Sequence, residues 1–146
     1  MKVLFVCTGN TCRSPAAEKM FSAAFPSAET RSRGTEVYRN NHITPQVGNF
    51  LKKNGLDFSE HRAALVAEED IDWADYIFVM EERQFSALAD RYPQSCRKMY
   101  AIKDFCYGEN GDVDDPIGRS DSFYERVMEE LKACVAVIAE KLGKRH

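Results

Sequence analysis

Short apolar runs alternate with amphipathic stretches along the whole chain. The continuous apolar run at residues 3–6 predicts a buried strand over residues 2–6. The next stretch opens at Ser14 and a following proline, a pair that favours a helix start, and carries apolar side chains at helical spacing as far as Ala24. A strand followed by an amphipathic helix is typical of proteins whose helices pack against a parallel sheet.

The alternation continues to the C-terminal end. Further strands are predicted at residues 28–33, 75–80 and 99–102, and further helices at residues 44–54, 81–91 and 121–143. A turn-rich stretch at 108–116 separates the last strand from the last helix, and a long loop at this place favours function. The whole pattern predicts an α/β sandwich.

Composition narrows the class of protein. The chain has 146 residues, 44% of them apolar and 29% charged, so we expect residues 1–146 to form a single domain with its own core. A formal net charge of −3 predicts no surface for nucleic acid or an anionic membrane, so an anion would be captured locally. No apolar run reaches the roughly 18 residues of a membrane span, and the N-terminal run is too short for a signal peptide. We expect a cytoplasmic protein.

The cysteines indicate free thiols. They number five, an odd count in a chain long enough to fold without crosslinks. Four residues lie between Cys7 and Cys12, unlike the two of a CxxC pair, and the histidines follow no ligand spacing. We expect no metal and no cofactor.

The segment from Cys7 to Ser14 joins the first predicted strand to the first predicted helix, where open α/β sheets bind ligands. Its backbone N–H groups and the helix N-terminus can cradle a tetrahedral anion. Gly9 and Asn10 tolerate the positive φ of a concave turn, and Arg13 can hold two phosphate oxygens. The same positive field favours a thiolate at Cys7, the form that nucleophilic attack requires.

A chance arrangement is the alternative for this segment. A cysteine with an arginine six residues later is a weak signal alone, and Cys7 would then be a buried structural residue. Several features stand where a phosphate site needs them around Cys7 and Arg13, which favours that site. They are the preceding strand, the glycine, the asparagine, the Ser-Pro pair and the following helix.

Residues 6–15, Val-Cys-Thr-Gly-Asn-Thr-Cys-Arg-Ser-Pro, resemble the phosphate loop V-C-x-G-N-x-C-R-S-P of the low-molecular-weight protein-tyrosine-phosphatases. The resemblance covers the whole chain and implies a Rossmann-like three-layer sandwich, with a twisted sheet of four parallel strands and helices on both faces. It implies that Cys7 forms a phosphocysteine, that Arg13 holds the phosphoryl oxygens, and that Asp115 is acid and then base.

The resemblance also assigns supporting roles. Asn10 would brace the loop together with Ser32 and His61, and Cys12 could trap an oxidised Cys7 in a reversible disulfide. The phosphate-binding residues are expected to be Thr8, Gly9, Asn10, Thr11, Cys12 and Ser14.

Cleavage of a phosphoester or phosphoramidate bond needs a proton donor near the loop. Asp115 is the best candidate from the sequence, because Pro116 restricts it to extended geometry. Asp114 is a rival acid, and a plain turn is the structural alternative. The family's Asp-Pro motif selects Asp115.

Two positions bear on the substrate, which we expect to be a phosphorylated protein that releases inorganic phosphate. Thr11 stands where typical tyrosine-directed members have Ile, and Ile117-Gly118 stands where they carry aromatic residues. This pattern resembles the protein arginine phosphatase branch, since a hydroxyl can hydrogen-bond a guanidinium nitrogen. Tyr38 can still offer an aromatic wall, so phosphotyrosine remains an alternative substrate, although phosphoarginine is favoured.

Two other classes of protein are alternatives. An arsenate reductase on the same fold would need two relay cysteines just after the central strand, and Cys96 and Cys106 lie farther along the chain. A non-catalytic phosphopeptide-binding module would need neither a thiolate in the loop nor an opposing acid, and this chain offers both.

Overall fold

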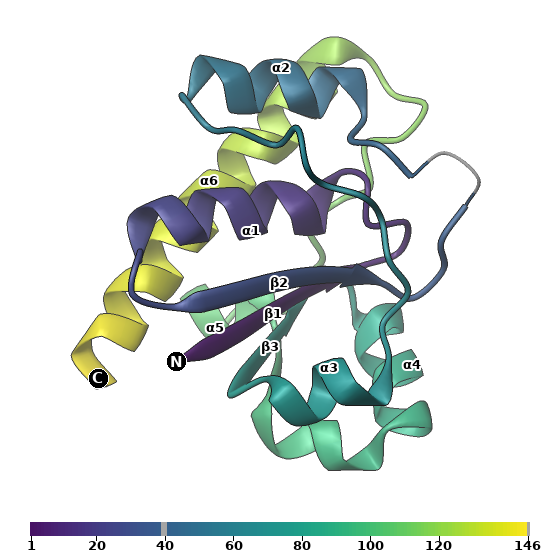
Figure 1. The fold of residues 1–146 in the computed structure, drawn as a ribbon, viewed down its shortest axis with the longest axis vertical. Helices are drawn as coiled ribbons and strands as arrows, with labels where there is room; N and C mark the ends of the chain where they lie inside the picture. Colours follow the sequence, from purple (N-terminus) through teal and green to yellow (C-terminus); the bar gives the residue numbers. More distant parts are fainter. Residues whose placement is uncertain (39–40, 146) are drawn as a thin grey trace.

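The computed structural model describes residues 1–38 and 41–145, and it confirms an α/β sandwich of three layers (Figure 1). Four parallel strands form one sheet in the order β2-β1-β3-β4. They are β1 (Lys2–Cys7), β2 (Glu29–Gly34), β3 (Tyr76–Val79) and β4 (Met99–Ala101). The four-stranded parallel sheet implied by the family resemblance is therefore confirmed.

Side chains alternate across the central strand β1, and this alternation builds an apolar layer on each face of the sheet. Val3 and Phe5 belong to one layer, and Leu4 and Val6 to the other. The first layer is covered by α1 (Arg13–Ala24), α2 (Pro45–Lys53), α5 (Ile102–Tyr107) and α6 (Asp121–Arg145). The second is covered by α3 (Glu68–Trp73) and α4 (Glu82–Arg91), on the opposite side of the sheet (Figure 1).

Three short elements were not predicted from the sequence. These are α3, the 3-10 helix η1 (Pro93–Lys98) and α5. The predicted strand at 99–102 is one residue too long, because Ile102 begins α5 directly after β4. Ile102, Phe105 and Cys106 are buried at helical spacing, but six residues are too few for that period to stand out.

The sheet register brings the ends of two strands together. Cys7 pairs with Gly34, and Val6 pairs with Val79, so the chain leaves β1 and β3 side by side at the carboxyl edge. Gly34 allows the loop after β1 to approach, since a Cβ at this position would lie 2.5 Å from the Thr8 carbonyl oxygen. Within the described residues, no helix combines the length and the apolar character needed to cross a membrane.

Candidate active site

A cavity of about 320 Å³ opens over the loop that follows β1. Seven of the nine residues proposed from the sequence line it: Cys7, Thr8, Gly9, Thr11, Cys12, Arg13 and Asp115. The other two, Asn10 and Ser14, belong to the same loop, but their side chains are fully buried and hydrogen-bond to each other, which holds the loop in shape. Asp114, the rival acid, does not line this cavity.

Cys7 lies at the base of the cavity and is 2% exposed. The Ser14 hydroxyl lies 2.9 Å from its sulfur, and the Ser14 backbone N–H donates to the same sulfur at 3.4 Å. Ser14 stands at the start of α1, where free N–H groups and the helix dipole favour negative charge. The backbone N–H can therefore stabilise a thiolate at Cys7. The Ser14 hydroxyl also donates to the Arg33 carbonyl at 3.3 Å, so it adds to this effect when its single proton turns to the sulfur.

Asn10 braces the loop with its side chain and its backbone. It has a φ of 56°, in the left-handed region that asparagine tolerates better than most residues. Its side chain donates to the Ser14 hydroxyl at 2.8 Å and accepts from the Ala64 N–H at 3.0 Å. Its carbonyl oxygen lies 2.8 Å from His61 Nε2, which must carry the proton because a carbonyl can only accept.

The expected brace from His61 is thus confirmed as a contact, whereas the expected brace from Ser32 is wrong. The Ser32 hydroxyl donates to Glu18 at 2.6 Å and not to the loop. Burial lowers the pKa of His61 below its ordinary value, against the opposing effect of its hydrogen bond to Asn10. The neutral ring therefore prevails at neutral pH.

Arg13 is 1% exposed, and its side chain lines the cavity. One of its terminal nitrogens is hydrogen-bonded to the protein. Nη1 donates to Glu81 Oε2 at 2.7 Å and to the Val113 carbonyl at 2.8 Å. Nη2 lies 3.7 Å from Asp115 Oδ2. Nε is buried and has no hydrogen-bond partner among the described residues. A buried guanidinium nitrogen is costly to leave unpaired, so Nε is a donor available to a bound anion.

The end of β3 contributes three residues that the sequence analysis missed as site residues. Arg83 and Gln84 both donate to the Thr8 hydroxyl, at 3.0 and 3.1 Å, and Glu81 holds Arg13. Adjacent parallel strands end at the same edge of a sheet, so a polar cluster directly after the predicted central strand was the signal that could have found them.

Cys12 lies beside Thr44, whose hydroxyl is 3.2 Å from its sulfur. The same hydroxyl donates to the Thr11 carbonyl at 3.1 Å, which leaves Cys12 as the donor in the first contact. Burial raises the pKa of the Cys12 thiol to about 11, so Cys12 stays protonated at neutral pH.

Asp115 lies at the mouth of the cavity with its side chain partly exposed. Its Oδ1 accepts from the Ile117 N–H at 3.1 Å, which fixes the carboxyl group in a turn that contains Pro116. Tyr38 and Ile117 complete the rim and are 58% and 55% exposed. The Tyr38 hydroxyl donates to Glu36 at 2.7 Å.

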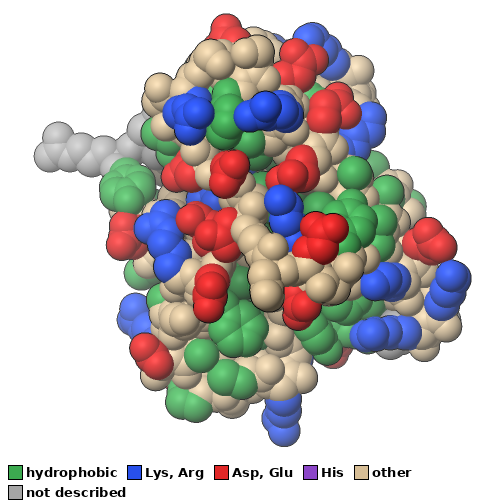
Figure 2. Space-filling model, turned by 180° about the vertical axis from the view of Figure 1, so that it is seen from behind, with side chains coloured by type: hydrophobic (Ala, Val, Ile, Leu, Met, Phe, Trp, Pro, Cys, Tyr) green, Lys and Arg blue, Asp and Glu red, His purple; other side chains and the backbone are tan. Residues whose placement is uncertain are grey.

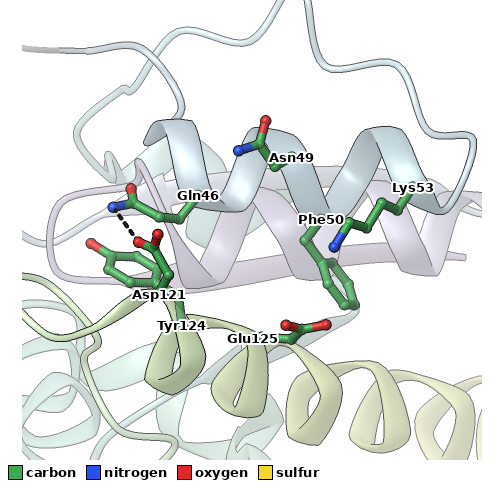
Figure 3. A pocket seen from close by; sticks show the side chains of 7 residues that line it. All are labelled: Gln46, Asn49, Phe50, Lys53, Asp121, Tyr124 and Glu125. Atoms are coloured by element: carbon green, nitrogen blue, oxygen red, sulfur yellow. Dashed lines mark hydrogen bonds between the residues drawn. The ribbon is translucent and has the colours of Figure 1, made fainter.

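A second cavity, of about 190 Å³, lies between α2 and α6 (Figure 3). Gln46 donates to Asp121 across it at 3.2 Å, and Lys53 and Glu125 add charges of opposite sign (Figure 3). None of its lining residues is a cysteine or a histidine.

No group of three His, Cys, Asp or Glu side chains is arranged to hold a metal ion within residues 1–38 and 41–145. Neither Cys96 nor Cys106 lines the cavity over Cys7. Cys96 is exposed, and the Cys106 thiol donates to the Cys134 carbonyl at 3.3 Å.

Comparison with known proteins identifies the family. Residues 2–146 match the family described as low molecular weight phosphotyrosine protein phosphatase. The chain belongs to this family. A protein-arginine-phosphatase of Geobacillus stearothermophilus is 33% identical over 142 residues, which cover 97% of this chain and 95% of that protein.

Solved structures of the same phosphatase family share the fold. The YwlE arginine phosphatase from Geobacillus stearothermophilus matches with a TM-score of 0.92 at 32% identity, covering 99% of this chain and 94% of that one. A low molecular weight protein tyrosine phosphatase from T. tengcongensis matches with a TM-score of 0.89 at 39% identity, covering 97% and 99%. A YwlE mutant with a phosphorylated active-site serine has a TM-score of 0.92 at 30% identity, covering 99% and 97%.

Proposed function

We propose that residues 1–146 form one catalytic domain, a protein phosphatase that works through a phosphocysteine at Cys7. The observation that carries this proposal is the buried Arg13 Nε, which has no partner among the described residues and belongs to the side chain that lines the cavity with Cys7. A phosphoryl oxygen is the acceptor that this nitrogen lacks. Nε and Nη2 together can form a bidentate pair with two phosphoryl oxygens.

In the first step the Cys7 thiolate attacks phosphorus while the bond to the leaving oxygen or nitrogen breaks. Asp115 donates its proton to the leaving group, which would otherwise depart as a poor anion. The phosphate-binding set Thr8, Gly9, Asn10, Thr11, Cys12 and Ser14 supplies backbone N–H groups or holds the loop in shape. The YwlE mutant with a phosphorylated active-site serine supports this step, because in that protein an active-site side chain carries the phosphoryl group.

In the second step water attacks phosphorus in the phosphocysteine. Asp115, now a carboxylate, takes a proton from the water, and the S–P bond breaks. Inorganic phosphate leaves, Cys7 returns as a thiolate stabilised by Ser14, and the cycle needs no metal or other cofactor.

The substrate of this reaction is a protein phosphorylated on arginine in preference to tyrosine. Thr11 lines the cavity and places a hydroxyl beside the phosphoryl group, where a guanidinium nitrogen can hydrogen-bond to it. Ile117 is exposed at the rim and offers no flat aromatic surface to a phenol ring. The relative named protein-arginine-phosphatase supports this preference.

Two further features bear on where the protein acts. All five cysteines are free, and a catalytic thiol requires a reducing compartment, which supports the cytoplasm. Figure 2 shows acidic and basic side chains interspersed over the described part of one face, which supports a phosphorylated protein, not nucleic acid or a membrane, as the partner.

Parallel assays on phosphoarginine and phosphotyrosine peptides test the substrate, with Thr11→Ile as the matched variant. We expect wild type to have the higher kcat/KM on phosphoarginine. Thr11→Ile should lower that value by about 10- to 100-fold, as loss of one hydrogen bond implies, and spare phosphotyrosine. A wild-type preference for phosphotyrosine, or an equal loss on both peptides, would refute the arginine assignment.

A further inference from the structure

The orientation of the Arg13 guanidinium depends on one acidic side chain. A guanidinium has five N–H groups, and the two on Nη1 are used by Glu81 and by the Val113 carbonyl. The three on Nε and Nη2 have no hydrogen-bond partner within the described chain, and Nη2 reaches Asp115 only at 3.7 Å. The contact at Nη1 therefore determines which edge of Arg13 is offered to the cavity.

Glu81 is itself held as a carboxylate. Its side chain is 13% exposed, and besides Arg13 it accepts from Arg83 Nε at 3.1 Å and from Gln84 Nε2 at 3.1 Å. Burial alone would raise the pKa of Glu81, but the hydrogen bonds from Arg83 and Arg13 lower it below the ordinary value. The charge on Glu81 thus persists through the neutral range.

Gln84 connects this carboxylate to the phosphate loop. The amide is buried, and its oxygen accepts from the backbone N–H groups of Met80 and Glu81, both at 2.9 Å. Its nitrogen donates to Glu81 and also to the Thr8 hydroxyl at 3.1 Å. Every polar atom of Gln84 is engaged, so the end of β3 and the loop after β1 form one rigid unit around Glu81.

We propose that Glu81 is a positioning residue for catalysis, which acts through Arg13. This inference rests on the proposed phosphatase activity. By binding Nη1, Glu81 turns the Nε and Nη2 edge of the guanidinium toward the phosphoryl oxygens, so that both donors are aligned as charge builds in the transition state. Without that carboxylate, Arg13 keeps its charge and can still attract a phosphate, but its bidentate edge is no longer fixed.

Glu81→Gln removes the charge and keeps the shape, and Glu82→Gln is the matched control. Glu82 is the next residue in the chain, is exposed, and lines a different cavity from Cys7. Glu82→Gln therefore removes one negative charge at the start of α4, as Glu81→Gln does, but away from the site. With p-nitrophenyl phosphate, Glu81→Gln should lower kcat by about 10- to 100-fold, the effect expected from a lost charge-assisted hydrogen bond. KM and the Kd for inorganic phosphate should change by less than about threefold, and Glu82→Gln should match wild type.

A double-mutant cycle with Arg13→Lys separates positioning from a structural role. Lysine has no fork for Glu81 to orient, so in that background Glu81→Gln should lower kcat by less than about twofold. An equal loss in both backgrounds, or a Glu81→Gln variant with wild-type kcat, would overturn the inference. If Glu81→Gln melts below the assay temperature, Glu81→Asp replaces it. Its shorter side chain should lower kcat, and a wild-type kcat would again overturn the inference.

These outcomes are distinct from a failure of the proposed function. A wild-type protein that neither hydrolyses p-nitrophenyl phosphate nor binds inorganic phosphate would overturn both proposals. An active wild type whose activity is insensitive to Glu81→Gln would overturn only the role of Glu81.

Discussion

Replacing Asn10 with alanine tests the architecture of the phosphate loop. The side chain is fully buried and makes two hydrogen bonds, to the Ser14 hydroxyl at 2.8 Å and from the Ala64 N–H at 3.0 Å. Each contributes about 0.5 to 1.5 kcal/mol, and alanine adds about 1 kcal/mol because it must adopt the φ of 56°. We expect Asn10→Ala to lower the free energy of unfolding by about 2 to 4 kcal/mol.

Asn10→Gly provides the matched control for this prediction. It removes the same two hydrogen bonds but accepts the positive φ, so it should be more stable than Asn10→Ala by about 1 kcal/mol. Chemical denaturation followed by tryptophan fluorescence measures both values, because Trp73 is the single tryptophan. A glycine variant as stable as wild type would refute the contribution of the hydrogen bonds. An alanine variant at least as stable as the glycine variant would refute the backbone argument.

Three further predictions follow from the same site. Asp115→Ala should slow hydrolysis by about 10²- to 10⁴-fold for poor leaving groups and by less for p-nitrophenol, and an equal loss across leaving groups would indicate a structural role. Peroxide should oxidise Cys7 to a sulfenic acid, and the Cys12 sulfur should then attack the Cys7 sulfur, so that a disulfide forms and water is lost. Mass spectrometry of peptides should find the Cys7–Cys12 disulfide in wild type and irreversible oxidation of Cys7 in Cys12→Ser. Burial lowers the pKa of His61 in the folded state. At a pH just below the unfolded pKa of about 6.5, His61 is therefore protonated more fully in the unfolded state than in the folded state. Stability should therefore fall as pH drops from 7 toward 5, and a flat denaturation midpoint over that range would contradict the prediction.

Much of the site could be predicted because its chemistry is local in the sequence. The proposed nucleophile, the turn residues, the arginine and the helix start follow one another between Cys7 and Ser14, and the loop geometry is a property of that segment. The buried strand β1 is equally local, since a run of apolar residues is sufficient to indicate it. Asp115 lies near Arg13 as expected, although the two are 102 positions apart in the sequence, because the Asp-Pro motif marks it.

The place of Glu81 and Gln84 at the carboxyl edge of the sheet could be inferred from the predicted central strand, but their individual contacts could not. Nothing in a stretch of charged and polar residues at a helix start distinguishes a solvated face from a buried network, and the distinction depends on strand order. Only the pairing of β1 with β3 brings this stretch against the loop. The role expected of Ser32 failed for a similar reason, since its hydroxyl is engaged by Glu18, a contact between α1 and β2 that the sequence does not mark.

The Cys7→Ser variant tests the central claim most directly. Serine keeps the loop N–H groups and leaves Arg13 in place, so calorimetry should show that inorganic phosphate still binds with a Kd near the wild-type value. Hydrolysis of p-nitrophenyl phosphate should be lost, and mass spectrometry of acid-quenched wild type during turnover should find phosphate on the peptide that contains Cys7. Near-wild-type activity in Cys7→Ser, or turnover without phosphate on that peptide, would contradict the account.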